Sequence, residues 1–410
     1  MLLVKILDML IVEGALTLID ACGVAHRFGR CADDSGEIVV RLSDRRLHWK
    51  LLLNTGLSLG EAYTDGTLTV ERGSVYDLLD LGARNVARMK PLQAPRLGRI
   101  LGRSRTFLQQ YNPPVRARRN VAHHYDLPDT LFDHFLDPDR QYSCAYFADP
   151  HMTLEEAQEA KKRQLATKLL LRPGQRVLDI GSGWGGLCLH LARIADVDVT
   201  GISLSARQVA AARRRAAEAG LEGRVRFHLC DYRGEAGEYD RIISVGMFEH
   251  VGVPHYGSFF RKLRDLLADD GVAVLHAIGR MDGPSNMDPW LQKHIFPGAH
   301  LPALSEVLPS IERAGLWVTD LEILRLHYAE TLRHWRWRFL ANAEAVARTH
   351  GARFRRMWEF YLASSEVGFR RCGLMVFQVQ LAKRVDAVPL TRDYLFEPAR
   401  SPDARLERAA

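Results

Sequence analysis

Residues 176–186 read RVLDIGSGWGG, and this stretch decides the fold. An apolar run that fits a buried strand leads directly into a glycine turn, and a helical pattern follows to about residue 195. Gly181, Gly183 and Gly186 have the spacing of a turn that lets the main chain approach a ligand closely. Alone this spacing is weak evidence, because a glycine turn that only packs a helix on a strand has it too.

Strand-like and helix-like segments alternate after this turn, which predicts a mostly parallel seven-stranded sheet covered on both faces. We expect the strands at VDVTGIS (197–203), RVRFHLCD (224–231), YDRIISVG (239–246), GVAVLHAIG (271–279), LWVTDLEIL (316–324) and MVFQVQLAKR (375–384). Two long amphipathic helices are expected at about 329–349 and 353–370, and a helical insert at about 280–315.

A smaller α+β unit is expected at the N-terminus. The strand-like runs LTLIDACG (16–23), HRFG (26–29) and EIVVRLSD (37–44) precede helices at about 46–62 and 74–88. From Leu81 to Tyr125 there is no acidic residue, but there are ten lysines and arginines and four prolines. We therefore divide the chain into an N-terminal domain (1–90), a basic linker (91–120), a catalytic domain (121–395) and a tail (396–410).

Composition narrows the class of protein. The chain has 410 residues, of which 47% are apolar and 26% charged, so it is globular and long enough for about two or three domains. No run of about 18 uncharged apolar residues occurs, which excludes a membrane-spanning helix. The six cysteines show no CxxC spacing and indicate reduced thiols in the cytoplasm, without a disulfide framework or a zinc site.

The charge favours an anionic partner. The sequence has 56 Lys+Arg against 49 Asp+Glu, a net charge of +7. The basic linker is either a solvated connection or a patch for anionic lipid headgroups. It lacks the interleaved aromatic residues of a nucleic-acid surface, and no nucleic-acid motif occurs, so we expect no nucleic-acid partner.

The residues beyond the glycine turn exclude a nicotinamide dinucleotide. That cofactor needs an acidic residue roughly 20 positions later, but Gly201–Leu204 contains none, and Asp179 lies inside the first strand instead. The string VLDIGSGWGG resembles the first motif of class I S-adenosylmethionine-dependent methyltransferases. This resemblance implies a Rossmann-like α/β fold.

Further strings make the resemblance specific. They are HHYDLPDTLFDHFLDPDRQYSCAYF (123–147), SVGMFEHVG (244–252), LHAIG (275–279) and HYAETLRHW (327–335). Together and in this order they resemble the cyclopropane fatty acid synthase family, over residues from about 110 to 390. LGEAYTDGTLTVERG (59–73) extends the similarity to the N-terminal domain of the members that act on phospholipids.

The resemblance implies a set of catalytic residues. Ring closure on an alkene requires a base beside a carbocation in a water-poor pocket, and in this family the base is thought to be a bound bicarbonate ion. Cys144, Glu249, His276 and Tyr328 would hold it through their side chains, and Ile278 through its main chain. Each also has a plain structural interpretation: a core cysteine, a polar residue after a strand, a core histidine and a helix start. Glu249 and His276 both fall at carboxyl ends of predicted strands, where such sheets bind ligands.

The resemblance also implies the residues that bind S-adenosylmethionine. They precede Cys144, line the first turn, and follow the second and third strands. They are Tyr142, Ser143, Asp179, Gly181, Gly183, Ser203, Leu204, Gln208, Asp231 and Tyr232. For Ser203 and Gln208, helix capping and a solvated face are the alternative.

The implied activity is transfer of a methylene group from S-adenosylmethionine to a cis double bond of a phospholipid acyl chain. The enzyme would work from the cytoplasm as a peripheral protein on the anionic inner membrane face, aided by the amphipathic segment 1–12, and as a homodimer. Aromatic residues of the second half would line an acyl channel near 280–300 and 329–370. A methylene- or methyl-branched product, a small-amine N-methyltransferase and a non-catalytic lipid-binding protein remain as alternatives.

Overall fold

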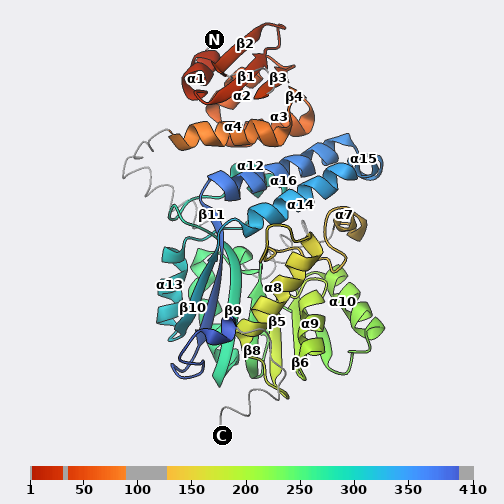
Figure 1. Cartoon of the computed structure of the whole chain (residues 1–410), viewed down its shortest axis with the longest axis vertical. Coiled ribbons are helices and arrows are strands. Elements are labelled where there is room, and N and C mark those ends of the chain that lie inside the picture. The colour runs from red at the N-terminus through yellow and green to blue at the C-terminus, as the bar shows by residue number, and fades with distance from the viewer. Residues whose placement is uncertain (1, 31–35, 89–126, 397–410) are drawn as a thin grey trace.

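The computed structural model describes residues 2–30, 36–88 and 127–396. A four-stranded sheet lies at one end of the molecule and a seven-stranded sheet at the other, with a helical layer between them (Figure 1). The predicted linker 91–120 and nearly all of the tail 396–410 lie outside the described residues.

In the N-terminal unit, apolar and polar residues alternate over short strands, so each strand buries one face of the sheet. In β3, Ile38, Val40 and Leu42 are buried while the residues between them are not, which is the period of a half-buried strand. The sheet has the order β2-β1-β3-β4. Its elements are α1 (Leu2–Leu10), β1 (Gly14–Ile19), β2 (Ala25–Arg30), β3 (Glu37–Leu42), α2 (Leu47–Leu53), α3 (Thr55–Asp65), β4 (Leu68–Arg72) and α4 (Val75–Arg88). The helix expected over 46–62 is two helices, because Asn54 leaves the helical conformation and caps α3 by accepting from the main-chain N–H of Leu57.

The larger sheet confirms the predicted fold class. Its order is β10-β11-β9-β8-β5-β6-β7, and among these strands β11 alone runs against the others, antiparallel to both β10 and β9. The strands are β5 (Arg176–Ile180), β6 (Asp198–Ser203), β7 (Val225–Leu229), β8 (Tyr239–Val245), β9 (Leu267–Arg280), β10 (Trp317–Leu324) and β11 (Leu374–Ala382). Each corresponds to a segment that the sequence predicts.

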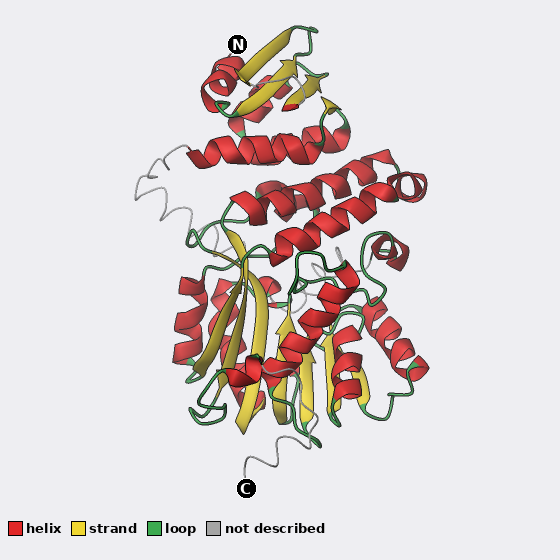
Figure 2. Ribbon diagram, in the orientation of Figure 1, coloured by secondary structure: helices red, strands yellow, loops and turns green. Residues whose placement is uncertain are grey.

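Helices cover both faces of this sheet (Figure 2). Neighbouring strand residues belong to different cores: Leu178 and Ile242 pack with one helical layer, and Val177 and Ile243 with the other. The first layer contains α11 (Tyr256–Leu266) and α13 (Leu304–Arg313), and the second contains α8 (Leu154–Leu169), α9 (Gly186–Ile194) and α10 (Ala206–Glu218). Burial on both faces explains why these strands are nearly continuous apolar runs.

The layer between the two sheets consists of α14 (His327–Ala341), α15 (Ala343–His350), α16 (Ala352–Arg371) and α12 (Pro289–His294) (Figure 1). The single helix expected over 329–349 is wrong: the chain breaks at Asn342, whose side-chain amide donates to the main-chain oxygen of His134 at 3.0 Å. α12 and α13 lie within the stretch 280–315, where a helical insert is expected. Short helical elements complete the described chain: α7 (Asp129–Asp133), η2 (Tyr232–Gly234), η3 (Phe248–His250), η4 (Val253–His255) and η5 (Asp393–Leu395).

The N-terminal unit packs directly on this helical layer. Lys293 pairs with Glu61 at 2.6 Å, Arg371 pairs with Asp80 at 2.8 Å, and the guanidinium of Arg356 donates to the main-chain oxygen of Thr64 at 2.9 Å. One apolar core runs through both parts. In the described part of the chain, no helix is long and apolar enough to cross a bilayer.

Candidate active site

A cavity opens where β5, β6, β7 and β8 end, and we call it the strand-end cavity. All ten residues predicted to bind the cofactor line it. They come from the loop before Cys144, the glycine turn after β5, and the segments that follow β6 and β7. Parallel sheets of this kind bind ligands at this edge, because the loops there diverge and leave a crevice.

The glycine turn needs glycine for two separate reasons. Gly181 has φ of +93°, which other residues rarely adopt, and a Cβ atom there would lie 2.7 Å from Cβ of Met247. Gly185 has φ of +82° and caps α9, and a Cβ atom there would lie 2.6 Å from the ring of Phe227. The turn therefore keeps main chain, and not side chains, at the cavity wall.

Polar side chains after β6 and β7 are held in pairs. The hydroxyl of Ser203 donates to Oε1 of Gln208 at 3.1 Å, and both residues line the cavity. The carboxylate of Asp231 accepts from the guanidinium of Arg233 at 2.6 Å. These pairs fix the side chains that a bound nucleoside would meet.

Lys161 of α8 is a cavity residue that sequence reasoning missed. Its ammonium group is buried and donates to Oε1 of Gln141 at 2.5 Å and to the hydroxyl of Ser143 at 2.9 Å. Burial lowers the pKa of Lys161 to about 8, against the opposing effect of Asp137 and Asp139. Burial raises the pKa of Asp179, which also lines the cavity, to about 6.

Glu249 lies beside this cavity in η3, directly after β8. Its Oε1 accepts the main-chain N–H of Ile278 at 2.6 Å, while its buried Oε2 has no hydrogen-bond partner among the described residues. Burial raises the pKa of Glu249 to about 7. Through this main-chain N–H, Ile278 orients the carboxyl group of Glu249.

His276 is buried in the middle of β9. The sequence places it at the carboxyl end of its strand, but β9 continues to Arg280. It pairs in register with Val245, the last residue of β8, and therefore lies at the edge where the parallel strands end. Burial lowers the pKa of His276 to about 3, an effect to which Lys161 and Lys168 add.

The 141–147 loop, which contains Cys144, contacts α14, which contains Tyr328. The main-chain N–H of Ala145 donates to the hydroxyl of Thr331 at 3.0 Å, and that of Phe147 donates to Nδ1 of His327 at 3.0 Å. Tyr328 is buried against Phe369, with ring centroids 4.8 Å apart. Burial raises the pKa of the Cys144 thiol far above its ordinary value.

We call Cys144, Glu249, His276 and Tyr328, the four residues whose side chains are predicted to hold an anion, the polar cluster. Lys161 lies in the wall of the strand-end cavity, and its charge pulls the pKa of Cys144, Asp179 and His276 downward. A local signal for Lys161 exists in the sequence: Gln158, Lys161 and Lys168 share the buried side of α8, where apolar residues are usual. The described residues contain no group of side chains suited to a metal ion, and their five cysteines are free; Cys31 lies outside them.

The fold and the cavity define the class of the protein. A seven-stranded sheet of this order, with a glycine turn after β5 and a ligand cavity at its carboxyl edge, is that of the class I S-adenosylmethionine-dependent methyltransferases. The chain is such an enzyme. The family model for mycolic acid cyclopropane synthetase matches residues 113–379, and the chain belongs to this family of cyclopropane fatty acid synthases, as the resemblance predicts.

Individual relatives agree with this assignment. The chain is 37% identical over 362 residues to cyclopropane-fatty-acyl-phospholipid synthase of Escherichia coli, which covers 88% of this chain and 92% of the relative. It is also 37% identical over 334 residues to the tuberculostearic acid methyltransferase UfaA1 of Mycobacterium tuberculosis, which covers 76% of this chain and 78% of that protein.

A solved structure identifies the cofactor. The mycolic acid cyclopropane synthase CmaA1, solved in complex with SAH and CTAB, superposes with a TM-score of 0.62 at 33% identity, over 66% of this chain and 99% of that chain. SAH is the demethylated form of S-adenosylmethionine, which is the cofactor of this enzyme.

Proposed function

We propose that this enzyme is a cyclopropane-fatty-acyl-phospholipid synthase. It transfers a methylene group from S-adenosylmethionine to the cis double bond of an unsaturated phospholipid acyl chain. The observation that carries this proposal is the environment of the Glu249 carboxyl group. This carboxyl group is buried next to the strand-end cavity, one of its oxygens has no hydrogen-bond partner in the described chain, and burial raises its pKa to about 7.

The chemistry explains why such a group is useful. An alkene is a weak nucleophile, and its attack on a sulfonium methyl group leaves a carbocation on the acyl chain. Ring closure then needs a base that removes a proton from the new methyl group while water is kept out. The buried aromatic rings of Tyr328 and Trp335 lie 5.7 Å apart at this site, and aromatic faces favour a nearby cation.

We assign the base to a bicarbonate ion held by the polar cluster. Bicarbonate, when bound, supplies a base of moderate strength that leaves as its conjugate acid. The imidazole of His276 and the phenol of Tyr328 are donors suited to an anion, and the thiol of Cys144, which donates to the main-chain oxygen of Ala145 at 3.3 Å, would exchange that bond for one to the ion. The free Oε2 of Glu249 is an acceptor suited to the ion's own hydroxyl group. The residues present therefore fit the ion.

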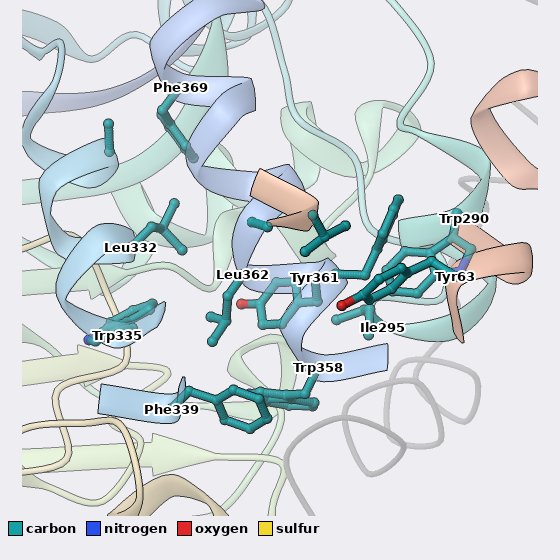
Figure 3. Close-up of a cluster of buried hydrophobic side chains, with 14 of the residues drawn as sticks. Tyr63, Trp290, Ile295, Leu332, Trp335, Phe339, Trp358, Tyr361, Leu362 and Phe369 are labelled. Carbon is teal, nitrogen blue, oxygen red and sulfur yellow. The ribbon is translucent and has the colours of Figure 1, made fainter. Parts of the chain in front are cut away.

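The acyl chain is assigned to the aromatic region between the N-terminal unit and α16. Tyr63, Trp290, Trp358 and Tyr361 gather there from α3, α12 and α16 (Figure 3). The hydroxyl of Tyr361 lies 2.7 Å from that of Tyr142, a residue of the cavity wall, so this region adjoins the cofactor site. Trp317 and Trp337 are 54% and 51% exposed and do not contribute to such a channel.

The N-terminal unit supports work at a membrane surface. On α1, Leu2, Ile6 and Met9 are exposed apolar residues, and Trp49 and Leu53 are exposed on α2. Such residues insert into a lipid headgroup region while basic residues attract anionic lipids. Peripheral association with the cytoplasmic membrane face and a homodimer remain predictions of this proposal.

A second candidate product is favoured by one observation. The tuberculostearic acid methyltransferase UfaA1 is as similar in identity to this chain as the cyclopropane synthase is. If a hydride first moved from the methyl-bearing carbon to the neighbouring cationic carbon, loss of a proton from the new methyl group would give a methylene-branched chain that retains a double bond. The donors and acceptors are the same, so only the product distinguishes the two activities.

The test is mass spectrometry of fatty acids after incubation with S-adenosylmethionine, bicarbonate and vesicles of a cis-monounsaturated phospholipid. Either product is heavier by one CH2 unit, so mild hydrogenation follows. A product that takes up no hydrogen supports the ring. A product that takes up two hydrogens supports the branched chain, and no mass gain would overturn both and direct the search to small amines. Vesicles of the saturated phospholipid are the control.

A further inference from the structure

Gln378 is a buried residue of β11 that pairs in register with His276 of β9. Residues directly opposite each other on neighbouring strands share one face of the sheet. The side-chain Nε2 of Gln378 lies 3.2 Å from Nδ1 of His276. Gln378 is outside the polar cluster but touches one of its members.

The orientation of the Gln378 amide is fixed by its other partners. The ammonium group of Lys168 lies 2.6 Å from Oε1 of Gln378 and can only donate, so this atom must be the oxygen. Nε2 then has two hydrogens, and Oε1 of Gln164 accepts one of them at 3.1 Å. His276 is left to accept the other.

A second chain of contacts gives the same orientation. Nε2 of Gln164 donates to the carboxylate of Glu322 at 2.9 Å, which turns Oε1 of Gln164 toward Gln378. Lys168 also donates to this carboxylate, at 2.5 Å. The charges of buried Lys168 and half-buried Glu322 thus orient both amides, because a flipped amide would turn its NH2 group toward the ammonium or its oxygen toward the carboxylate.

The consequence concerns the proton of the His276 ring. A neutral imidazole has one nitrogen that accepts and one that donates. Because Nδ1 accepts from Gln378, the ring hydrogen is on Nε2. A second proton on Nδ1 would face the N–H of Gln378, and burial together with Lys161 and Lys168 also disfavours the charged ring.

We infer that Gln378 is a positioning residue that holds His276 as its Nε2-protonated tautomer, so that this ring can only donate a hydrogen bond to the anion in the polar cluster. His276 is therefore a binding group and not the base of the reaction. This inference rests on the proposed function for the identity of the anion, but the tautomer can be measured without it.

The first measurement uses the full-length wild-type protein with 15N-labelled histidine. Long-range nitrogen–proton correlations distinguish the two neutral tautomers, and the signals of His276 are those absent from the H276Q variant. We expect Nε2 to be protonated and Nδ1 to be unprotonated. A ring protonated on Nδ1, or on both nitrogens at neutral pH, would overturn the inference.

The second measurement uses Gln378→Glu, which keeps the shape but replaces the donor by an acceptor. His276 should then carry a proton on Nδ1, and the concentration of bicarbonate needed for half-maximal turnover should rise about tenfold or more, because a hydrogen bond to an ion is lost. Binding of SAH should change little.

Gln380→Glu is the matched control. Gln380 is equally buried on the same face of β11, but it donates to the main-chain oxygen of Lys168 and accepts from Thr319. It should leave the His276 tautomer and the bicarbonate requirement unchanged. If Q378E changes the tautomer without changing the bicarbonate requirement, the link from His276 to the anion is wrong. If wild-type turnover needs no bicarbonate while His276 is protonated on Nε2, the proposed base fails and the tautomer assignment stands.

Discussion

The strand-end cavity and the polar cluster are neighbours built in different ways. The cavity is formed by main chain at the glycine turn and by polar side chains that are already paired, such as Ser203 with Gln208. The polar cluster is buried. Burial raises the pKa of Cys144 and Glu249 and lowers that of His276, and each shift favours the uncharged form of the side chain. A cavity wall whose polar side chains are hydrogen-bonded to one another suits a polar cofactor that remains partly hydrated. The polar cluster is buried from water, and one carboxyl oxygen of Glu249 has no hydrogen-bond partner among the described residues. Such a site suits a carbocation intermediate, which water would trap.

The largest effect should come from breaking the cluster while sparing the cavity. Glu249→Gln removes the carboxylate but keeps an oxygen for the N–H of Ile278, so turnover should fall by about 100-fold or more. Affinity for SAH, measured by calorimetry, should stay within about twofold because Glu249 does not line the cavity.

Glu306→Gln is the control for this change. Glu306 also accepts a main-chain N–H, that of Ala303 at 2.9 Å, but it lies in the first turn of α13. It should keep wild-type turnover. Full activity of E249Q in the absence of bicarbonate would show that the cluster has been assigned the wrong role.

The next largest effect should come from a substitution in the wall of the strand-end cavity. Lys161→Met removes the donor that Gln141 and Ser143 share, and leaves two buried polar groups without it. We expect the dissociation constant of SAH to rise about tenfold, since a hydrogen bond from a charged group is worth about 1.5–3 kcal/mol. Calorimetry with SAH measures it.

Lys262→Met provides the comparison for K161M. Lys262 donates to the main-chain oxygen of Glu235 at 2.6 Å and lies outside the cavity wall. Its variant should bind SAH normally. Equal affinity in K161M and the wild type would mean that Lys161 has no part in shaping the cavity.

A third prediction uses the pH dependence of stability. Burial raises the pKa of Glu249 from 4.5 to about 7. The folded state therefore binds this proton more tightly than the unfolded state. The resulting stabilisation is fully present below pH 4.5 and is lost as the pH rises through about 7. Relative to E249Q, the wild type should lose about 3 kcal/mol of unfolding free energy between about pH 4 and pH 8. Urea titrations of both proteins measure it, and parallel pH profiles would contradict the buried acid.

The smallest effect should come from a packing contact outside both regions. A Cβ atom on Gly60 of α3 would lie 2.5 Å from the buried ring of Trp290, so Gly60→Ala should cost about 1–3 kcal/mol of stability. Gly82→Ala in α4 is the control, because a Cβ atom there meets nothing within 4 Å and alanine favours a helix. Thermal unfolding compares them. If G60A were as stable as G82A, the contact of the N-terminal unit with α12 would be looser than the structure shows.

The same contrast explains what could be predicted from the sequence. Residues of the cavity sit in short motifs, because the turn after β5 and the ends of β6 and β7 are local features. All ten predicted cofactor residues accordingly line the cavity. The fold class followed from the alternation of apolar runs with helical patterns.

The partners of the polar cluster could not be predicted in this way. Lys161 and Gln378 are distant in sequence from the residues they orient, and only the packing of α8 and β11 brings them there. The hydrogen bond from the N–H of Ile278 to Glu249 also depends on the approach of η3 to β9. The break of the predicted helix at Asn342 likewise depends on a contact with His134, a tertiary effect that local propensity does not contain.

The most direct test of the account is the yield of cyclopropane fatty acid as a function of bicarbonate in buffer depleted of carbon dioxide, with vesicles of a cis-monounsaturated phospholipid. The account predicts that the yield falls on depletion and returns when bicarbonate is added, while the affinity for SAH stays constant. An unchanged yield of the cyclopropane product in depleted buffer would contradict it.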